Sequence, residues 1–322
     1  MSVSNDSIVI YIIIHQQMFQ PVLSEGLVSK VSFAILMSLF FIYLNAIMVY
    51  TLWSKSVFKE TPRYILFNHM LFNDLIQLFV TSLLYILSLA YLKLVVAACA
   101  FVIFVTSTTF LNAPLNLAVM SVESYVAITF PLRHAEIASQ KKTYIAIGII
   151  WCTSMIQFII DLFYVLLTDP TFFSSQIFCT REGLFIKQWQ LDAYQGVNMF
   201  YFVSVSVIIL FTYIRILITA RSITSNKESA AKAHKTVLLH IIQLGLCLTS
   251  FLYSIIERAA ATSSTSTSLF MDLRYLNYLF VLILPRCLSP LIYGLRDDCV
   301  RPLFIYYFRC ATGKSRSTVY VQ

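Results

Sequence analysis

The sequence has little charge for its length. Only 12% of its 322 residues are Asp, Glu, Lys or Arg, whereas 59% are hydrophobic. Average soluble domains carry about a quarter charged residues, so this chain has too little polar surface to cover a soluble fold. The composition predicts a protein that crosses a lipid bilayer several times.

The sequence also lacks the short motifs of common enzymes. Its seven glycines form neither a phosphate-binding loop nor a nucleotide-binding pattern. There is no metal-ligand spacing and no nucleophile placed beside a base. The net charge of +8 lies in short segments between apolar runs, which argues against nucleic-acid binding. We predict a protein that is not an enzyme and that uses no metal, cofactor or nucleic-acid partner.

Seven apolar runs are long enough to cross a bilayer as helices. Each meets the requirement for about 20 mostly apolar residues, and continuous apolar runs differ from the alternating pattern of a membrane β-barrel. We predict an all-α membrane protein, a seven-transmembrane helix bundle followed by a short amphipathic helix. The predicted spans are 29–52, 64–91, 94–128, 143–167, 191–219, 235–256 and 275–294.

Lys and Arg are distributed unevenly between the two ends of these spans. Sixteen of them lie in segments on one side and six on the other, with Arg286 inside the last span. The positive-inside rule then places the N-terminus outside the cell. We expect an extracellular tail over 1–28, the bundle over 29–294 and a cytoplasmic helix and tail over 295–322. Asn5 begins an Asn-Asp-Ser glycosylation sequence in the outer tail.

Two of the seven cysteines lie on the outer, oxidising side of this topology. They are Cys99, at the start of the third span, and Cys179, in the loop after the fourth. Disulfides persist in such an environment, so we predict that the pair is bridged and holds the loop over the bundle. Two free thiols are the alternative.

The cytoplasmic tail alternates basic and apolar residues from Arg301 to Arg309. This pattern suits a helix that lies on the inner leaflet. Cys310 at its end is a candidate palmitoylation site, with an unmodified thiol as the alternative.

Three motifs follow one another in order along the chain. They are MSVESYVAITFPLRHAEI at the end of the third span, KAHKTVLLH (232–240) before the sixth and LPRCLSPLIYGLRD (284–297) in the seventh. Together with Asn45, Asp74 and Trp151 they resemble odorant receptors of the rhodopsin-like G-protein-coupled superfamily, especially those of fish. The resemblance covers about 30–309. It implies a plasma-membrane receptor that binds a small odorant and activates a heterotrimeric G protein through cAMP-type signalling.

Asp74 is the one acid in its span, and a mid-bilayer Asp costs roughly 2.5–3.5 kcal/mol on insertion scales. It should therefore face the interior and find polar partners, for which Asn45 and Ser289 are the best candidates. In the wider superfamily this acid takes part in a sodium-linked switch. Ala113 and Ser289 depart from that pattern, so the alternative is a neutral Asp that sets helix packing.

The resemblance also identifies residues for activation and coupling. Pro290 should form a hinge, and Tyr293 should swing inward with Tyr213 as its counterpart; interfacial anchoring is the alternative for either tyrosine. His240 closes the motif that enters the sixth span.

In the wider superfamily, an acid, an arginine and a tyrosine stand in a row at the inner end of the third helix. Glu123 and Tyr125 match the acid and the tyrosine, but Ser124 replaces the arginine. Serine forms no guanidinium contact, so Glu123 should pair with Arg133, Lys235 or another cytoplasmic cation, or be protonated.

The same family binds ligands between the outer halves of the third, fifth, sixth and seventh helices. Helical spacing gives a mostly apolar and aromatic lining, typical of a small-molecule pocket, with core packing as the alternative for each aromatic residue. Asp161 is a candidate for tuning ligand access. The lining residues predicted are Thr106, Phe110, Asn198, Tyr201, Phe251, Ile255 and Tyr275.

Two other functions fit a multi-span membrane protein. A transporter of small solutes would show internal repeats and matched broken helices, and no repeat is apparent. A rhodopsin-like receptor for a lipid or peptide remains the second alternative. A retinal protein would need a lysine within the seventh span, where this chain has Arg286.

Overall fold

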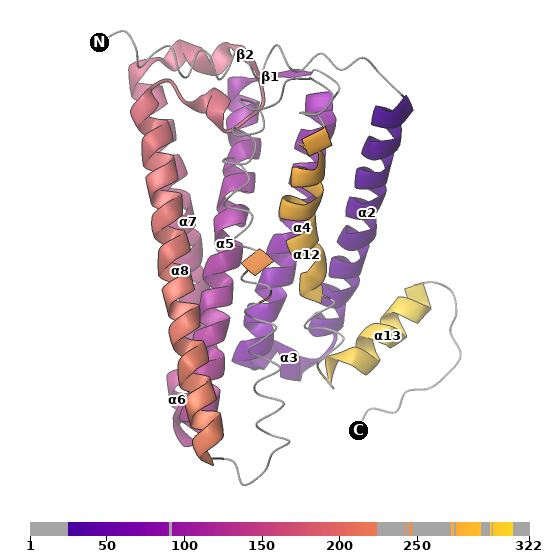
Figure 1. Ribbon diagram of the computed structural model, residues 1–322, viewed down its shortest axis with the longest axis vertical. Coiled ribbons are helices and arrows are strands. Elements are labelled where there is room, and N and C mark those ends of the chain that lie inside the picture. The colour runs from indigo at the N-terminus through magenta and orange to yellow at the C-terminus, as the bar shows by residue number, and fades with distance from the viewer. Residues whose placement is uncertain are drawn as a thin grey trace.

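The computed structural model describes residues 25–89, 92–223, 242, 245–246, 272–273, 275–290, 297 and 299–311. Apart from two short strands, these residues are almost entirely helical (Figure 1). The elements, in which η denotes a 3-10 helix except for the π-helix η4, are α2 (Glu25–Trp53), α3 (Ser56–Glu60), α4 (Pro62–Leu89), β1 (Lys93–Val95), α5 (Val96–Thr129), η1 (Pro131–Arg133), α6 (His134–Ile137), α7 (Gln140–Thr168), η2 (Pro170–Ser174), β2 (Gln176–Phe178), η3 (Glu182–Leu184), α8 (Gln188–Ile223), η4 (Tyr278–Ile283), α12 (Leu284–Ser289) and α13 (Val300–Ala311).

The first five predicted spans are confirmed. Within the described part of the chain, α2, α4, α5, α7 and α8 are each long and apolar enough to cross a membrane. Their ends lie within about four residues of the predicted ones. The seventh predicted span is present as η4 and α12, whereas the sixth, 235–256, lies outside the described residues. The all-α bundle predicted from the sequence is therefore confirmed.

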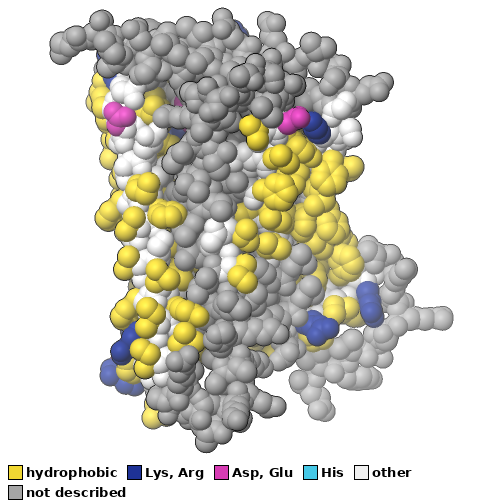
Figure 2. All heavy atoms as spheres, in the orientation of Figure 1, with side chains coloured by type: hydrophobic (Ala, Val, Ile, Leu, Met, Phe, Trp, Pro, Cys, Tyr) yellow, Lys and Arg dark blue, Asp and Glu magenta, His cyan; other side chains and the backbone are white. Residues whose placement is uncertain are grey.

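Helix α5 is the centre of the bundle. It contacts α4, α7 and α8, and 50% of its apolar window is buried, compared with 22% in α7 and α8. The other helices expose large apolar side chains on their outer faces, and Figure 2 shows such side chains over a broad area of the surface. Exposed apolar side chains on long helices are expected where lipid, and not water, is the solvent.

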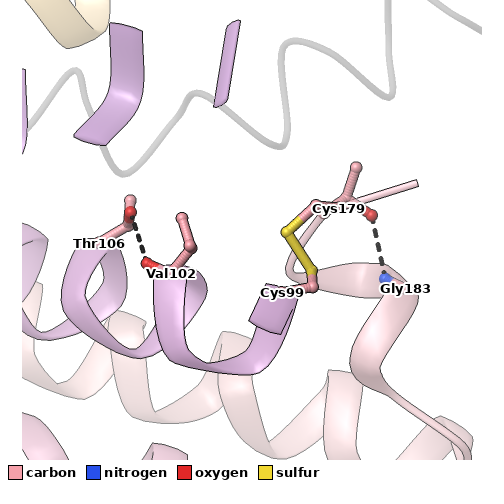
Figure 3. Close-up of a disulfide and its surroundings, with 6 residues drawn as sticks. Cys99, Val102, Thr106, Cys179 and Gly183 are labelled. Carbon is pink, nitrogen blue, oxygen red and sulfur yellow. Dashed lines mark hydrogen bonds between the residues drawn. A yellow bond between two sulfur atoms is a disulfide. The ribbon is translucent and has the colours of Figure 1, made fainter. Parts of the chain in front are cut away.

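At one end of the bundle, strands β1 and β2 form a short antiparallel ladder, in which Leu94 pairs with Ile177. The predicted disulfide is confirmed directly beside it: Cys99 at the start of α5 is bonded to Cys179, with 5.4 Å between their Cα atoms (Figure 3). The ladder and the disulfide together hold the α7–α8 loop (169–187) across the ends of α5 and α7. We call this end the outer end, following the predicted topology.

The opposite, inner end carries α3, α6 and α13 (Figure 1). The predicted amphipathic helix after the seventh span is confirmed as α13. Its Val300, Leu303 and Phe304 are buried in one cluster with residues of α2 and α4, while Arg301 is exposed. The Asp297 carboxylate accepts hydrogen bonds from the backbone N–H groups of Cys299 and Val300. This N-terminal cap fixes where α13 begins.

Candidate functional site

The predicted ligand-lining residues lie on the expected helices but do not form one described cup. Thr106, Phe110, Asn198, Tyr201 and Tyr275 are each half-buried. The Thr106 hydroxyl donates to the Val102 carbonyl within α5, at 3.0 Å (Figure 3). The remaining two predicted residues, Phe251 and Ile255, fall outside the described residues.

Two of the predicted tyrosines face different neighbours. The Tyr201 hydroxyl donates to the Thr153 carbonyl of α7 at 3.0 Å. Tyr275 instead packs against a cluster of α2, α4 and η4 residues that includes Leu78 and Tyr278. Asn198 lies one turn after Tyr194 on α8. The α8 residues and Tyr275 therefore lie on different sides of the bundle.

A separate hollow lies between α5, α7 and the α7–α8 loop. Its wall consists of Val96 and Ala100 of α5, four residues of α7 and four of the loop. Its empty volume, including the part open to solvent, is about 270 Å³. We call it the outer hollow, and none of the seven predicted lining residues belongs to its wall.

The outer hollow contains a buried ion pair. Arg181 of the loop donates from Nη2 to Oδ2 of Asp161 on α7 at 2.5 Å, and the side chains are only 9% and 7% exposed. Gln157 donates to the same carboxylate at 3.4 Å. From the sequence, Asp161 was predicted to lie at the outer end. Arg181 was only one of the six basic residues on the outer side that were used to orient the spans.

Aromatic rings surround the Arg181 guanidinium. Its central carbon lies 4.7 Å from the ring centre of Phe158, 5.1 Å from that of Phe185 and 5.2 Å from that of Tyr194. Such cation–π contacts partly replace lost hydration. Burial lowers the pKa of Arg181 from its usual value, although Tyr194 and Asp161 oppose that shift. Because arginine keeps its proton at any physiological pH, a fixed cation lies at this site.

A second buried ion pair joins α4 to α12. Arg286 donates from Nη1 to Oδ1 of Asp74 at 3.0 Å, and the two side chains are 5% and 1% exposed. The predicted partners of Asp74 were therefore incomplete: Asn45 directs its side-chain amide N–H to the Phe41 carbonyl instead. The Arg286 guanidinium therefore lies beside the Asp74 carboxylate, where the sodium-linked switch of the superfamily would need a sodium ion. In the sequence, Arg286 lies between Pro285 and Pro290, and both prolines are buried.

A neutral polar network connects α4, α5 and α7 nearer the inner end. The Trp151 indole donates to Nε2 of His69 at 2.9 Å, so this nitrogen carries no proton. Nδ1 of His69 must then be the donor to Oδ1 of Asn116, 3.1 Å away. The sequence identified Trp151 as part of the family resemblance but did not identify His69 as its partner. The signal available was that a buried indole N–H requires an acceptor.

At the inner end, Glu123 pairs with a histidine. Oε1 of Glu123 lies 3.1 Å from Nε2 of His134, the first residue of α6, and the side chains are 9% and 28% exposed. Arg133, one of the alternatives expected for Glu123, instead contacts Glu136 at the surface. The short helix η1 at Pro131–Arg133 turns the chain, and His134 directly after it contacts α5. Lys235 lies outside the described residues.

Ser124 and Tyr125 lie beside this pair. The Ser124 hydroxyl donates to the Met120 carbonyl of its own helix at 2.9 Å. The Tyr125 ring lies edge-on to Phe130 and to Phe211 of α8, and Tyr213 is half-buried on the same helix. The inner end of α5 therefore presents an aromatic contact with α8 and no arginine.

Several predicted residues lie outside the described part of the chain. They are Asn5, His240 and Tyr293, and the side chain of Cys310 is also not described. Their roles stay predictions.

A helical bundle with a disulfide-bound outer loop and an inner amphipathic helix is typical of the seven-helix receptor class. Residues 11–293 match the family of 7 transmembrane receptors (rhodopsin family). The chain is 33% identical over 271 residues to Odorant receptor 131-2 of Danio rerio, covering 84% of this chain and 82% of that protein. It is 26% identical over 202 residues to Olfactory receptor-like protein OLF4 of Canis lupus familiaris, covering 60% of this chain and 62% of that protein. The chain belongs to the odorant receptors of the rhodopsin family.

Proposed function

We propose that this receptor binds a small odorant molecule at its outer end and activates a heterotrimeric G protein at its inner end, without acting as an enzyme. The observation that carries the proposal is the 33% identity to an odorant receptor over 84% of the chain, which includes both ends of the bundle. The resulting signal is of the cAMP type. The receptor lies in the plasma membrane with its N-terminus outside, as the distribution of Lys and Arg favours.

The outer end has the features that ligand capture requires. The Cys99–Cys179 bond restrains the α7–α8 loop above the helices, so polar groups of the loop are held in place before a ligand arrives. Preorganisation of this kind lowers the entropic cost of binding. The predicted pocket residues Thr106, Phe110, Asn198 and Tyr201 lie on the helices beneath this loop.

Two polar contacts link ligand binding to the inner end. The Asp74–Arg286 pair joins α4 to α12, and η4 directly before α12 is a π-helix, a feature often found at functional sites. The Glu123–His134 pair holds α6 against α5. A shift of α12 relative to α4, with Pro290 as hinge, changes the first contact, and G-protein binding replaces the second. Tyr293, Tyr213 and His240 act in the same inner region.

The remaining proposals concern modifications at the two ends. Asn5 carries an N-linked glycan, which requires the N-terminus to lie outside the cell. Cys310 at the end of α13 carries a palmitoyl group, which adds to the membrane affinity of that helix.

The experiment is a cAMP assay in cells that display the receptor at the surface. Wild type and Ser124→Arg are compared against pools of volatile and water-soluble odorants. A ligand-dependent rise in wild type is expected, because the Tyr125 region and the basic inner segments provide the coupling surface. A response only in Ser124→Arg would show that the receptor binds odorants but couples poorly. Silence of both variants at normal surface display would contradict the proposal.

A further inference from the structure

We propose that Arg286 is a built-in cation at Asp74, which takes the place that a diffusible sodium ion has in the wider superfamily and makes this receptor independent of sodium. The inference goes beyond the proposed function, because it concerns a cation site between α4 and α12 and involves neither an odorant nor a G protein. It also predicts that the Asp74 carboxylate accepts sodium once the guanidinium is removed.

The Asp74–Arg286 pair is a buried carboxylate with a permanent cation beside it. Nη1 of Arg286 lies 3.0 Å from Oδ1 of Asp74, and the side chains are 5% and 1% exposed. Asp74 is the one acid of α4, and an acid at this depth in a bilayer requires a partner. Because arginine keeps its proton at any physiological pH, the chain itself supplies the cation.

A sodium ion at the same carboxylate would add a second positive charge to a buried site. One carboxylate balances one cation, and two cations a few ångströms apart repel each other strongly where the effective dielectric constant is low. Sodium would therefore bind only if Arg286 left Asp74. The guanidinium would then be buried without its ion-pair partner, which is strongly unfavourable. The charge balance thus favours the guanidinium over the ion.

The residues around the pair also fit a sodium ion poorly. Hard cations are held by several oxygen ligands. Ala113, which departs from the superfamily pattern, is buried on α5 and has no side-chain oxygen. Asn45 has one, but its amide group is held within α2, where it donates to the Phe41 carbonyl at 2.9 Å. The cation that the structure places at Asp74 is the guanidinium.

A tethered cation differs from an ion because it cannot dissociate from the protein. Arg286 lies on α12, which directly follows the π-helix η4 and contacts α4. The link between α4 and α12 therefore forms at any sodium concentration and changes only when α12 moves. Sodium outside the cell then has no influence on how α12 lies against α4.

The test is thermal unfolding of the purified full-length receptor in nanodiscs of zwitterionic lipid. NaCl, KCl and N-methyl-D-glucamine chloride are compared at the same ionic strength of about 0.15 M, so that general screening is equal. We expect wild type to unfold at the same temperature in all three salts and to bind no radioactive sodium. A wild type that sodium stabilises above both other cations would overturn the proposal.

The variant Arg286→Ser removes the guanidinium and leaves room for a small cation with water. An ion that binds only the folded state raises the unfolding temperature in a saturable way. We expect a rise of about 2–4 °C in sodium relative to N-methyl-D-glucamine, together with binding of radioactive sodium. A folded Arg286→Ser receptor with neither response would contradict the proposal, because Asp74 would then be unable to hold a diffusible cation.

Three further variants are the matched controls. Arg286→Met loses the same charge but fills the space, so it should respond to sodium less than Arg286→Ser does. Arg286→Lys keeps a tethered cation and should be as indifferent to sodium as wild type. Arg286→Ser with Asp74→Asn has neither charge, and a sodium response in this double variant would place the ion elsewhere and overturn the assignment.

Wild type and Arg286→Lys keep the proposal testable if Arg286→Ser does not fold, since sodium stabilisation of either protein would refute it. Neither unfolding nor sodium binding requires an odorant or a G protein. A silent cAMP assay would therefore refute the proposed function and leave this inference intact, whereas sodium-dependent unfolding of wild type would do the reverse.

Discussion

In the described part of the receptor, two Asp–Arg pairs are buried in different surroundings. Asp161–Arg181 joins a helix to a loop, and its arginine contacts three aromatic rings and the wall of a hollow. Asp74–Arg286 joins two helices in the bundle, with side chains 1% and 5% exposed. The two pairs therefore use the same chemistry at different depths and on different kinds of backbone.

The difference indicates what each pair does. Arg181 is buried among three rings and tied to α7, so it fixes how the α7–α8 loop lies over the bundle. An arginine on α12, between Pro285 and Pro290, instead fixes how α12 lies against α4. The two pairs therefore hold different parts of the fold, the outer loop and α12, and variants of each pair should have separable effects.

The largest effect on stability is expected at the Asp74–Arg286 pair. Arg286→Met leaves Asp74 as an uncompensated buried charge, which costs about 3–5 kcal/mol of stability. Thermal unfolding in nanodiscs and surface display should both show a severe loss. Asp74→Leu with Arg286→Met should restore most of the stability, because neither charge remains. A double variant that is as unstable as Arg286→Met would show that the ion pair is not the reason.

Loss of the disulfide is expected to come next. Cys99→Ser with Cys179→Ser should cost about 2–4 kcal/mol and release the loop that carries Arg181. The change should weaken the odorant-dependent cAMP response while the Asp74–Arg286 pair stays intact. An unchanged response after removal of the disulfide would show that the loop is held by other contacts.

Arg181→Met should have a smaller effect on stability than Arg286→Met. Asp161 keeps a contact with Gln157 and lies at the outer end, so a cost of about 1–3 kcal/mol is expected. Unfolding measured beside Arg286→Met provides the comparison. Equal losses in the two variants would remove the distinction between the pairs.

The smallest effect on stability is expected at the inner end. His134→Ala removes the partner of Glu123, and a partly exposed pair of this kind contributes about 1 kcal/mol or less. Basal cAMP should nevertheless change, since α6 loses a tie to α5. His134→Gln, which retains a hydrogen-bond donor, should stay close to wild type. Basal cAMP that is equal in all three proteins would show that the pair does not restrain signalling.

The sequence predicted the helices and the disulfide because these depend on local patterns. Apolar runs have ends that composition reveals, and the positions of Cys99 and Cys179 follow from topology. The need of Asp74 for a polar partner was also predictable from its cost in a bilayer. These parts required no knowledge of how one helix is rotated against another.

The partners themselves were not predictable in the same way. A π-helix at Tyr278–Ile283 changes the rotation of the residues that follow it, and this brings Arg286 to Asp74. Arg181 lies in a loop without periodicity, where its position two residues after Cys179 was the one available signal. The choice of His134 over Arg133 depends on the turn at Pro131, which a sequence pattern does not resolve.

The most direct test of the central claim is the odorant-dependent cAMP response of surface-displayed wild-type receptor. The account predicts a saturable, dose-dependent rise with at least one small odorant, in a receptor that has Ser124 and no arginine at that position. No response to any odorant, from wild type or from Ser124→Arg at equal surface display, would contradict it.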